Sequence, residues 1–495
     1  MSNKGSNNDV EATSLSMDEK SGKHVAEQYE NEPSFSPQQT RKLLSKMDIA
    51  ILPLVATMYL LSFLDRSNIG NARLAGLEAD LGMKGWDYAT AVSVFFPFYI
   101  ASEVPSNLAM KKFRPSIWIP SIMVTWGVVM TLMGLVHNFE GLLASRMMLG
   151  LAEGGLFPGV TYYITLWYRR HECGLRIAIF FSAATAAGAF GGLLARGIME
   201  MDGVGGRQGW QWIFILEGIL TVVVAGISFF YLHDYPDTAK FLTEDERKEV
   251  VRRLKDDNTA LSHEIKGQFI KDAFKDWKIW INCLIAISNF LPLYSISVFL
   301  PTIIRGLGYT NEKAQLMTVP PYILACMCTI GMGYWTDKRQ TRGVYVIGIA
   351  FVAIIGFIIL LSVESNGVKY FATFLVLLGI FPNVPQLTSW NSNNIGGSVK
   401  RGVGVAMQIG AGNIGGAVSG FIFQAKDAPH YRMGHGILLG LCGLTMLLGA
   451  FMTVYLRREN ARRDAAHKAP SEYSFAEMEL EKDKGDYATF FRYTI

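Results

Sequence analysis

Long apolar stretches dominate the chain, and short polar segments separate them. A helix needs about 20 apolar residues to cross a bilayer core of about 30 Å. Twelve stretches approach this length, and they cover residues 48–69, 87–109, 116–136, 140–166, 175–200, 211–232, 280–304, 315–336, 344–362, 369–390, 402–424 and 435–456. The pattern therefore predicts an all-α membrane protein with twelve transmembrane helices.

A strongly charged segment, residues 233–279, separates the sixth predicted span from the seventh. Within it, Thr243 is followed three residues later by Glu246, which is the capping-box pattern at the start of a helix. The segment therefore predicts a cytosolic linker that contains a helix. It divides the chain into two six-helix bundles, residues 41–232 and 280–456, and parallel six-helix repeats are one of the architectures of transporters.

A small-residue motif recurs in the two halves. The fifth predicted span contains AGAFGG at residues 187–192, and the eleventh contains AGNIGG at residues 411–416. Within the second copy, Gly410, Gly412 and Gly415 also spell the G-x-G-x-x-G pattern of dinucleotide-binding proteins. That pattern requires a preceding strand, whereas here it lies in a predicted membrane span. We therefore expect these glycines to let helices approach closely.

Polar segments flank the predicted spans at both ends of the sequence. Residues 1–40 predict a disordered cytosolic tail, and residues 457–495 predict a second cytosolic tail. The first segment has no apolar core and no small-residue cleavage site, so we expect no signal peptide. Near its end, Ser36, Pro37 and Gln39 form a capping-box start. They predict a short amphipathic helix on the inner membrane face.

The composition agrees with a membrane protein. Of the 495 residues, 50% are hydrophobic and 18% are charged, whereas soluble domains are about a quarter charged. Lysine and arginine concentrate in the loops on the side of the two termini, so the positive-inside rule predicts cytosolic termini. We expect an integral protein of the plasma membrane.

Patterns for other chemistries are missing from the sequence. The five cysteines have neither zinc-site spacing nor a pairable disulfide framework. No nucleophile–base pair or phosphate-binding loop occurs in a suitable context. We therefore expect no enzyme activity, cofactor, metal or nucleic-acid partner.

Four charged residues stand out inside the predicted spans: Asp65 and Arg66 in the first, and Arg146 and Glu153 in the fourth. Such residues are costly in a membrane and usually mark ion or substrate pathways. The helical rise of 1.5 Å per residue places Asp65, Arg66 and Arg146 at similar depth, so a local ion-pair cluster is possible. Glu153 lies nearer the midplane with no obvious partner at its own depth, which suits proton exchange. The alternative is that these charges pair only to fix helix packing.

Two motifs resemble signatures of the major facilitator superfamily. They are RMMLGLAEGG at residues 146–155 and GYWTDKRQTR at residues 333–342, which looks like the cytoplasmic gating loop. More narrowly, LDRSNIGNA, KMDIAILPL and WNSNNIGG resemble the anion:cation symporter branch, particularly the fungal allantoate, nicotinate and pantothenate permeases. The similarity extends over nearly all of residues 40–460.

The resemblance implies roles for particular residues. It implies proton coupling by Asp65 and Glu153, and carboxylate recognition by Arg66 and Arg146. It also implies a gating function for the loop that contains Gly333, Asp337, Lys338 and Arg342. The corresponding loop of the first half, PSNLAMKKFRP, has no aspartate. We therefore expect its charge relay to be degraded or replaced.

Further polar residues of the second half are candidates for orienting a small carboxylate by hydrogen bonds or ring stacking. They are Asn289, Tyr294, Tyr322, Asn391 and Asn394. The alternative for each is an ordinary interhelical contact. In the first half, Arg196 either extends to the outer interface or faces the substrate.

These observations predict a proton-coupled transporter that imports a small organic anion by alternating access. Its partners are then the anion, protons and the lipid bilayer, and we expect a monomer. The carboxylate is left open between nicotinate, allantoate, pantothenate and a sugar acid. Two alternatives are an efflux transporter for a metabolite or drug, and a membrane nutrient sensor that signals without transport.

Overall fold

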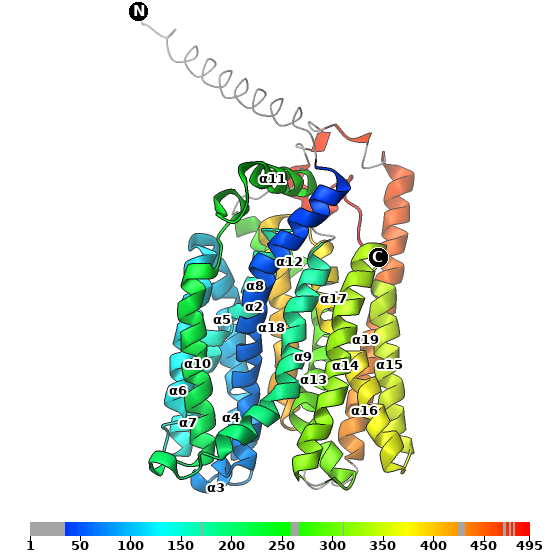
Figure 1. The fold of residues 1–495 in the computed structure, drawn as a ribbon. Coiled ribbons are helices and arrows are strands. Elements are labelled where there is room, and N and C mark those ends of the chain that lie inside the picture. The colour runs from blue at the N-terminus through cyan, green and yellow to red at the C-terminus, as the bar shows by residue number, and fades with distance from the viewer. Residues whose placement is uncertain are drawn as a thin grey trace, which may run out of the picture.

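The computed structural model describes residues 35–495 apart from 170–171, 259–266, 310, 424–430, 469–471, 475–476 and 479–480. Within this part all regular elements are helical, and the long helices run side by side along one axis (Figure 1). The prediction of an all-α protein is therefore confirmed.

The helices fall into a first half, a linker and a second half. The first half contains α2 (Pro37–Leu74), α3 (Leu77–Asp80), α4 (Asp87–Ser93), α5 (Phe95–Lys112), α6 (Pro115–Met133), α7 (Phe139–Glu153), α8 (Leu156–Thr165), α9 (Cys173–Met199), η1 (Val204–Gly206) and α10 (Gly209–Tyr231). The linker contains η2 (Pro236–Thr238), α11 (Glu244–Asn258) and α12 (Gly267–Lys275). The second half contains α13 (Trp277–Gly306), α14 (Asn311–Arg339), α15 (Gly343–Ser362), α16 (Asn366–Ile380), α17 (Asn383–Asn393), α18 (Ser398–Ser419) and α19 (Arg432–Ala466), followed by η5 (Lys482–Tyr487).

Each predicted span coincides with helix. In the described part, nine helical segments are long and apolar enough to cross a membrane. The other three predicted spans are α4–α5, which divides at Val94, α7–α8, which divides at Gly154 and Gly155, and the glycine-rich α18. The number of crossings therefore stays a prediction.

Two seams join the halves. In one, α9 packs along α14, and in the other α5 packs along α18. We call the end of the molecule that carries α11 and α12 the linker end; the start of α2 and the C-terminus lie there too (Figure 1). Both seams run along the helices, so residues between the halves are enclosed.

The N-terminal helix differs from the prediction. Its capping box is confirmed, because the Ser36 N–H donates to Gln39 Oε1 (2.8 Å) and the Gln39 N–H donates to Ser36 Oγ (3.3 Å). However, α2 continues from Pro37 to Leu74 without interruption, with Pro53 inside it. The prediction of a separate helix on the membrane face is therefore wrong. Helix α2 begins at Pro37, within the segment predicted to be a disordered tail. Residues 1–34 of that tail lie outside the described residues.

The linker helix α11 begins at the predicted capping box. The Thr243 N–H donates to Glu246 Oε2 (2.9 Å), and the Glu246 N–H donates to Thr243 Oγ1 (3.4 Å). Glu246 also forms an ion pair with Lys46 of α2 (2.6 Å). The linker is therefore tied to the first helix.

The C-terminal residues fold back onto the linker end of the second half. We call residues 481–495 the docked segment. Its Asp486 is fully buried, 2.8 Å from Lys278 Nζ and 2.6 Å from Lys400 Nζ. Near the end of the segment, the carbonyl oxygen of Thr494 accepts hydrogen bonds from Trp390 Nε1 (2.9 Å) and Asn394 Nδ2 (3.0 Å). Part of the predicted polar tail is therefore a packed element.

Glycines let helices pack closely, as expected for the eleventh span. A Cβ at Gly412 would lie 2.5 Å from the ring of Phe290, and one at Gly415 would lie 2.8 Å from the backbone nitrogen of Leu291. Both glycines lie inside α18, without a preceding strand. The interpretation of G-x-G-x-x-G as a packing motif is therefore confirmed.

A close glycine contact in the first half gives a stability prediction. At Gly150 of α7, an added Cβ collides with the carbonyl oxygen of Phe95 and lies 3.1 Å from the backbone nitrogen of Tyr99. Because backbone atoms cannot move aside alone, we expect Gly150→Ala to lower the free energy of unfolding by about 1–3 kcal/mol or more. Thermal unfolding in detergent measures this. The control is Gly192→Ala in α9, where a Cβ meets no atom within 4 Å; equal stability of the two variants contradicts the prediction.

Candidate functional site

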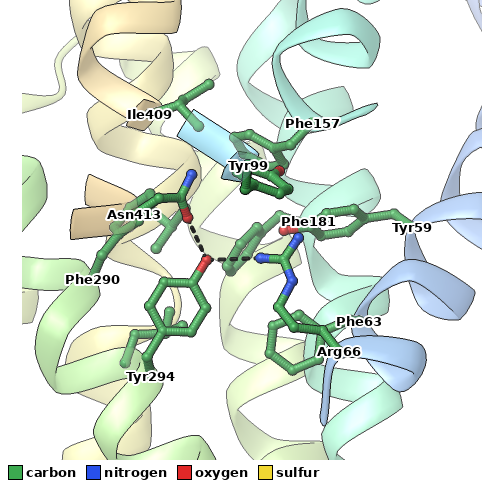
Figure 2. A pocket seen from close by; sticks show the side chains of 12 residues that line it. Tyr59, Phe63, Arg66, Tyr99, Phe157, Phe181, Phe290, Tyr294, Ile409 and Asn413 are labelled. Atoms are coloured by element: carbon green, nitrogen blue, oxygen red, sulfur yellow. Dashed lines mark hydrogen bonds between the residues drawn. The ribbon is translucent and has the colours of Figure 1, made fainter. Parts of the chain in front are cut away.

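An enclosed cavity lies between the two halves (Figure 2). Its lining comes from α2, α5, α8 and α9 of the first half and from α13, α17 and α18 of the second, and consists of Tyr59, Phe63, Arg66, Tyr99, Phe157, Phe181, Phe290, Leu293, Tyr294, Val384, Ile409 and Asn413. Seven of the twelve are aromatic, and Arg66 carries the only charge among them. The cavity volume is about 10 Å³, enough for about one water molecule. The halves are therefore closed around the site.

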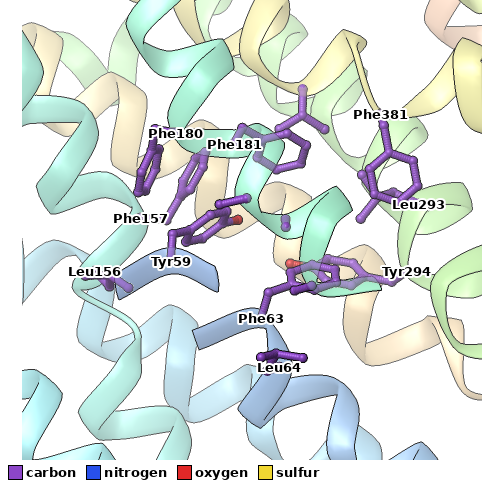
Figure 3. Close-up of a cluster of buried hydrophobic side chains, with 14 of the residues drawn as sticks. Tyr59, Phe63, Leu64, Leu156, Phe157, Phe180, Phe181, Leu293, Tyr294 and Phe381 are labelled. Carbon is purple, nitrogen blue, oxygen red and sulfur yellow. The ribbon is translucent and has the colours of Figure 1, made fainter. Parts of the chain in front are cut away.

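Aromatic rings continue from the cavity wall into the surrounding core (Figure 3). The Tyr59 ring lies 4.5 Å from the ring of Phe180 and 5.3 Å from that of Phe157, measured between centroids. Phe181 of α9 approaches Phe381 of the second half at 6.5 Å. The wall near the α9–α14 seam therefore consists mainly of aromatic rings.

Arg66 is held by a carboxylate and two aromatic rings. Its Nη2 donates to Glu153 Oε1 at 2.6 Å, and its Nη1 donates to the hydroxyl of Tyr294 at 3.0 Å. The guanidinium carbon lies 4.7 Å from the ring centroid of Tyr99 and 5.2 Å from that of Phe95. The arginine is therefore fixed in a buried environment, where charge pairing is strong.

Glu153 is fully buried and has a partner, contrary to the sequence-based expectation. Besides Arg66, it accepts a hydrogen bond from Ser62 of α2. The expectation compared backbone depths, whereas the ion pair is made by the end of the long arginine side chain. The candidate carboxylate and the candidate cation of the two helices thus form one ion pair.

The ion pair continues into a chain of hydrogen bonds across the interface between the halves. The Tyr294 hydroxyl donates to Asn413 Oδ1 (2.7 Å), as Figure 2 shows. Asn413 Nδ2 in turn donates to Glu103 Oε1 (2.8 Å). Neither Glu103 nor Asn413 is among the site residues predicted from the sequence. Two signals in the sequence mark them: an acid within the second predicted span, and an asparagine at one of the two positions where AGNIGG differs from AGAFGG.

Asp65 lies apart from this chain. Its Oδ2 accepts hydrogen bonds from Trp126 Nε1 (3.1 Å) and Thr221 Oγ1 (3.0 Å), and the residue is fully buried within the first half. Adjacent residues of a helix point about 100° apart, so Arg66 faces the cavity while Asp65 faces α6 and α10. The ion-pair cluster of Asp65 with the two arginines, which the similar depths made possible, is therefore not formed.

Arg146 joins two helices of the first half. Its Nε donates to the carbonyl oxygen of Ala91 (3.1 Å), and its guanidinium carbon lies 5.0 Å from the ring centroid of Phe95. It does not line the cavity in this closed arrangement. Arg196 is exposed near the end of α9 and is also absent from the lining.

Of the five polar candidates in the second half, only Tyr294 reaches the cavity. Asn289 Nδ2 donates to the carbonyl oxygen of Ile380 (3.4 Å), and Asn391 Nδ2 donates to Gln408 Oε1 (3.0 Å). The ring of Tyr322 packs edge-on against Phe381, with centroids 5.6 Å apart. Asn394 binds the docked segment. These four residues therefore make structural contacts here, because the sequence pattern does not reveal which side of each helix faces the interface.

The predicted gating loop ties α14 to the start of α9. Asp337 Oδ2 accepts a hydrogen bond from the Leu175 N–H (2.6 Å), and its other oxygen pairs with Arg342. Arg342 Nη1 also donates to Gln386 Oε1 (3.1 Å). A Cβ at Gly333 would lie 2.5 Å from that of Ala178, so this glycine permits the close approach of the two helices.

The remaining loop residue, Lys338, is exposed. The matching loop of the first half is organised differently. There Asp234, which follows α10, accepts a hydrogen bond from the Ser116 N–H (2.9 Å) at the start of α6. This carboxylate stabilises a helix start within one half and does not join the halves. At the linker end, the gating-loop aspartate Asp337 therefore joins the two halves at the α9–α14 seam, whereas Asp234 of the first half makes no such connection among the described residues at the α5–α18 seam.

Comparison with known proteins identifies the family. Residues 55–420 match the sequence model of the family Major Facilitator Superfamily. The MFS-type transporter cnsO of Penicillium expansum is 35% identical over 93% of this chain and 92% of its own. The high-affinity nicotinic acid transporter of Saccharomyces cerevisiae is 33% identical over 88% of this chain and 81% of its own.

Solved structures agree on the fold. The proton:xylose symporter XylE superposes with a TM-score of 0.63 at 15% identity, covering 82% of this chain and 96% of its own. The human organic anion transporter MFSD10 superposes with a TM-score of 0.59 at 13% identity, covering 81% and 99%. The family match and the sequence relatives together show that this chain belongs to the major facilitator superfamily and is a transmembrane transporter of that type.

Proposed function

We propose that the protein is a proton-coupled transporter that imports a small, ring-bearing organic carboxylate. The observation that carries the proposal is the position of Arg66, the single charged residue of an aromatic cavity lining, in an ion pair with Glu153. A planar guanidinium binds carboxylates through two parallel hydrogen bonds, and the flanking rings offer faces for stacking. The similarity to a nicotinic acid transporter supports the same class of substrate.

Competition for Arg66 supplies a coupling mechanism. When a substrate carboxylate binds the guanidinium, Glu153 loses its cation while it remains buried. An uncompensated buried carboxylate is costly, so it takes up a proton instead. Loss of the substrate on the other side restores the ion pair and releases the proton. Substrate and proton therefore move together.

Polar groups at the cavity determine the orientation of the substrate. The Tyr294 hydroxyl and the Asn413 amide already bind one another in the closed state. Separation of the halves frees both groups for a heteroatom of the substrate ring. Asp65, which is enclosed by Trp126 and Thr221, takes no part in this exchange, and Glu153 is the proton carrier of the proposal.

Uptake into proteoliposomes tests the function. We expect labelled nicotinate, or another member of a panel with allantoate, pantothenate and a sugar acid, to accumulate when protons flow inward. A protonophore should abolish the accumulation. The Glu153→Gln variant should exchange substrate across the membrane without accumulating it, because glutamine cannot carry a proton.

The same experiment separates the alternatives. Accumulation driven only by an outward proton gradient supports efflux. Binding of a panel member without flux supports a sensor. Accumulation that survives the protonophore excludes proton coupling.

A further inference from the structure

Glu103 of α5 is a buried acid that the exchange between Arg66 and Glu153 does not use. Its side chain is 1% exposed, and Oε1 accepts its hydrogen bond from Asn413 of α18. Oε2 has no hydrogen-bond partner in the described part of the chain. A Cβ at Gly410 would lie 2.6 Å from Oε2, so the glycine leaves the space that the carboxyl group occupies.

The surroundings of Glu103 favour a neutral carboxyl group. A buried ionised carboxylate requires hydrogen bonds or a cation to offset the loss of hydration. From helix α18, the groups next to the Glu103 carboxyl group are the Asn413 amide and Gly410. The titratable groups that interact electrostatically with Glu103 are Arg66 of α2, Tyr99 of its own helix and Tyr294 of α13. The tyrosines are neutral, and Arg66 makes its ion pair with Glu153, so the second oxygen is left without compensation.

Glu103 also lies where the halves meet. Its partner Asn413 belongs to the other half. Ser93, the last residue of α4 just before α5, extends the same seam, because its Oγ donates to the carbonyl oxygen of Ala417 in α18 (2.7 Å). Opening of the α5–α18 seam separates Glu103 from Asn413 and admits water to both carboxyl oxygens. The state of this group is therefore linked to closure of the seam.

We propose that Glu103 is a further proton-binding residue of the transport cycle, which closes the α5–α18 seam when it is protonated. On opening, the O–H bond breaks, the proton passes to water and the electron pair stays on the carboxylate. On closing, a proton returns and Asn413 binds the neutral group again. The role in transport rests on the function proposed above, whereas the closure of the seam is measured without transport.

A cysteine pair reports closure directly. A Cβ at Gly420 would lie 3.9 Å from Ser93 Oγ, so Ser93→Cys with Gly420→Cys forms a cross-link when the seam is closed. In purified protein, we expect the cross-linked fraction to fall as the pH rises, although thiols become more reactive. With Glu103→Gln added, the fraction should no longer fall. The same fall in both backgrounds overturns the proposal.

Transport gives the second readout. We expect Glu103→Gln to lower accumulation driven by the proton gradient by about tenfold or more, while exchange at equal pH stays close to that of the wild type. The control Ser93→Ala removes an uncharged contact of the same seam and should keep both activities. If Ser93→Ala lowers accumulation as much as Glu103→Gln, the carboxyl group is only a packing contact and the proposal fails.

A second variant guards against misfolding of Glu103→Gln. Gly410→Ala keeps the acid but places a methyl group against Oε2, so the pH midpoint of cross-linking should shift; an unchanged midpoint contradicts the proposal. If the wild type carries none of the panel anions while cross-linking depends on Glu103, the proposed function fails and this assignment stands. If accumulation is proton-driven but neither cross-linking nor accumulation changes in Glu103→Gln, the proposed function stands and the assignment of Glu103 fails.

Discussion

Arg66→Ala is expected to abolish measurable uptake of the carboxylate. Truncation of one partner of a buried charge pair costs about 2–5 kcal/mol, which corresponds to a loss of at least about thirtyfold in affinity. The variant also leaves Glu153 buried without its cation, and we expect the free energy of unfolding to fall by about 3–5 kcal/mol. Uptake into proteoliposomes and thermal unfolding in detergent measure the two effects.

Two further variants separate the effects on binding and stability. Arg66→Ala combined with Glu153→Gln removes both charges, so stability should recover while uptake stays absent. Arg66→Lys keeps the charge but lacks the planar fork that binds a carboxylate, and we expect weak uptake. Uptake by Arg66→Ala within threefold of the wild type, or no recovery in the double variant, is incompatible with the proposed site.

Asp486→Ala is expected to detach the docked segment. The buried carboxylate lies between Lys278 and Lys400, and Asp276 is the other acid of the cluster, 2.7 Å from Lys400. Its removal leaves two buried ammonium groups with one carboxylate, so we expect a loss of about 3–5 kcal/mol in the unfolding free energy. The control is Asp464→Ala, because Asp464 is largely exposed in its ion pair with Arg492 and such pairs contribute at most about 1 kcal/mol.

The contribution of Asp486 also depends on pH. Burial alone would raise the pKa of its carboxyl group, but the attraction of Lys278 and Lys400 outweighs this and lowers the pKa below its usual range. A lowered native pKa stabilises the fold above the unfolded value of about 3.9. The stability difference between wild type and Asp486→Ala should therefore be constant near neutral pH and shrink as the pH falls below about 4. A difference that grows on acidification disproves this assignment.

The fold was largely predictable because membrane helices are encoded by composition. A span of about 20 apolar residues is readable without knowledge of its neighbours, and the capping boxes at Ser36 and Thr243 involve residues three apart. The continuity of α2 was not predictable from the same local rules. A proline, Pro53, lies inside it, and the polar segment before it extends beyond the apolar span as one helix.

The site was only partly predictable, because it depends on which side of each helix faces the interface. Arg66 and Asp65 are neighbours in sequence, yet one faces the cavity and the other faces Trp126. The partners of Asp65 come from apolar-looking helices, so nothing marks them as polar ligands. Likewise, Asn391 and Asn394 belong to one polar motif but bind Gln408 and the docked segment.

The docked segment escaped prediction for a different reason. A polar composition without apolar periodicity indicates a solvated tail. Here it is held by charges, by backbone hydrogen bonds and by the burial of Phe490, Phe491 and Tyr493 in a hydrophobic cluster of the second half. Arg463, for example, donates from Nη1 to the carbonyl oxygens of Asp486, Ala488 and Phe491.

Helix α2 is long enough to connect the cavity directly with the linker. Its 38 residues extend over about 57 Å at 1.5 Å per residue, more than the 40–45 Å of a whole bilayer. Arg66 lies at the cavity and Lys46, twenty residues earlier on the same helix, holds Glu246 of α11. A tilt of α2 would therefore displace α11 at the far end. The fluorescence of a label on α11 would then report substrate binding in the cavity, from a position away from the substrate.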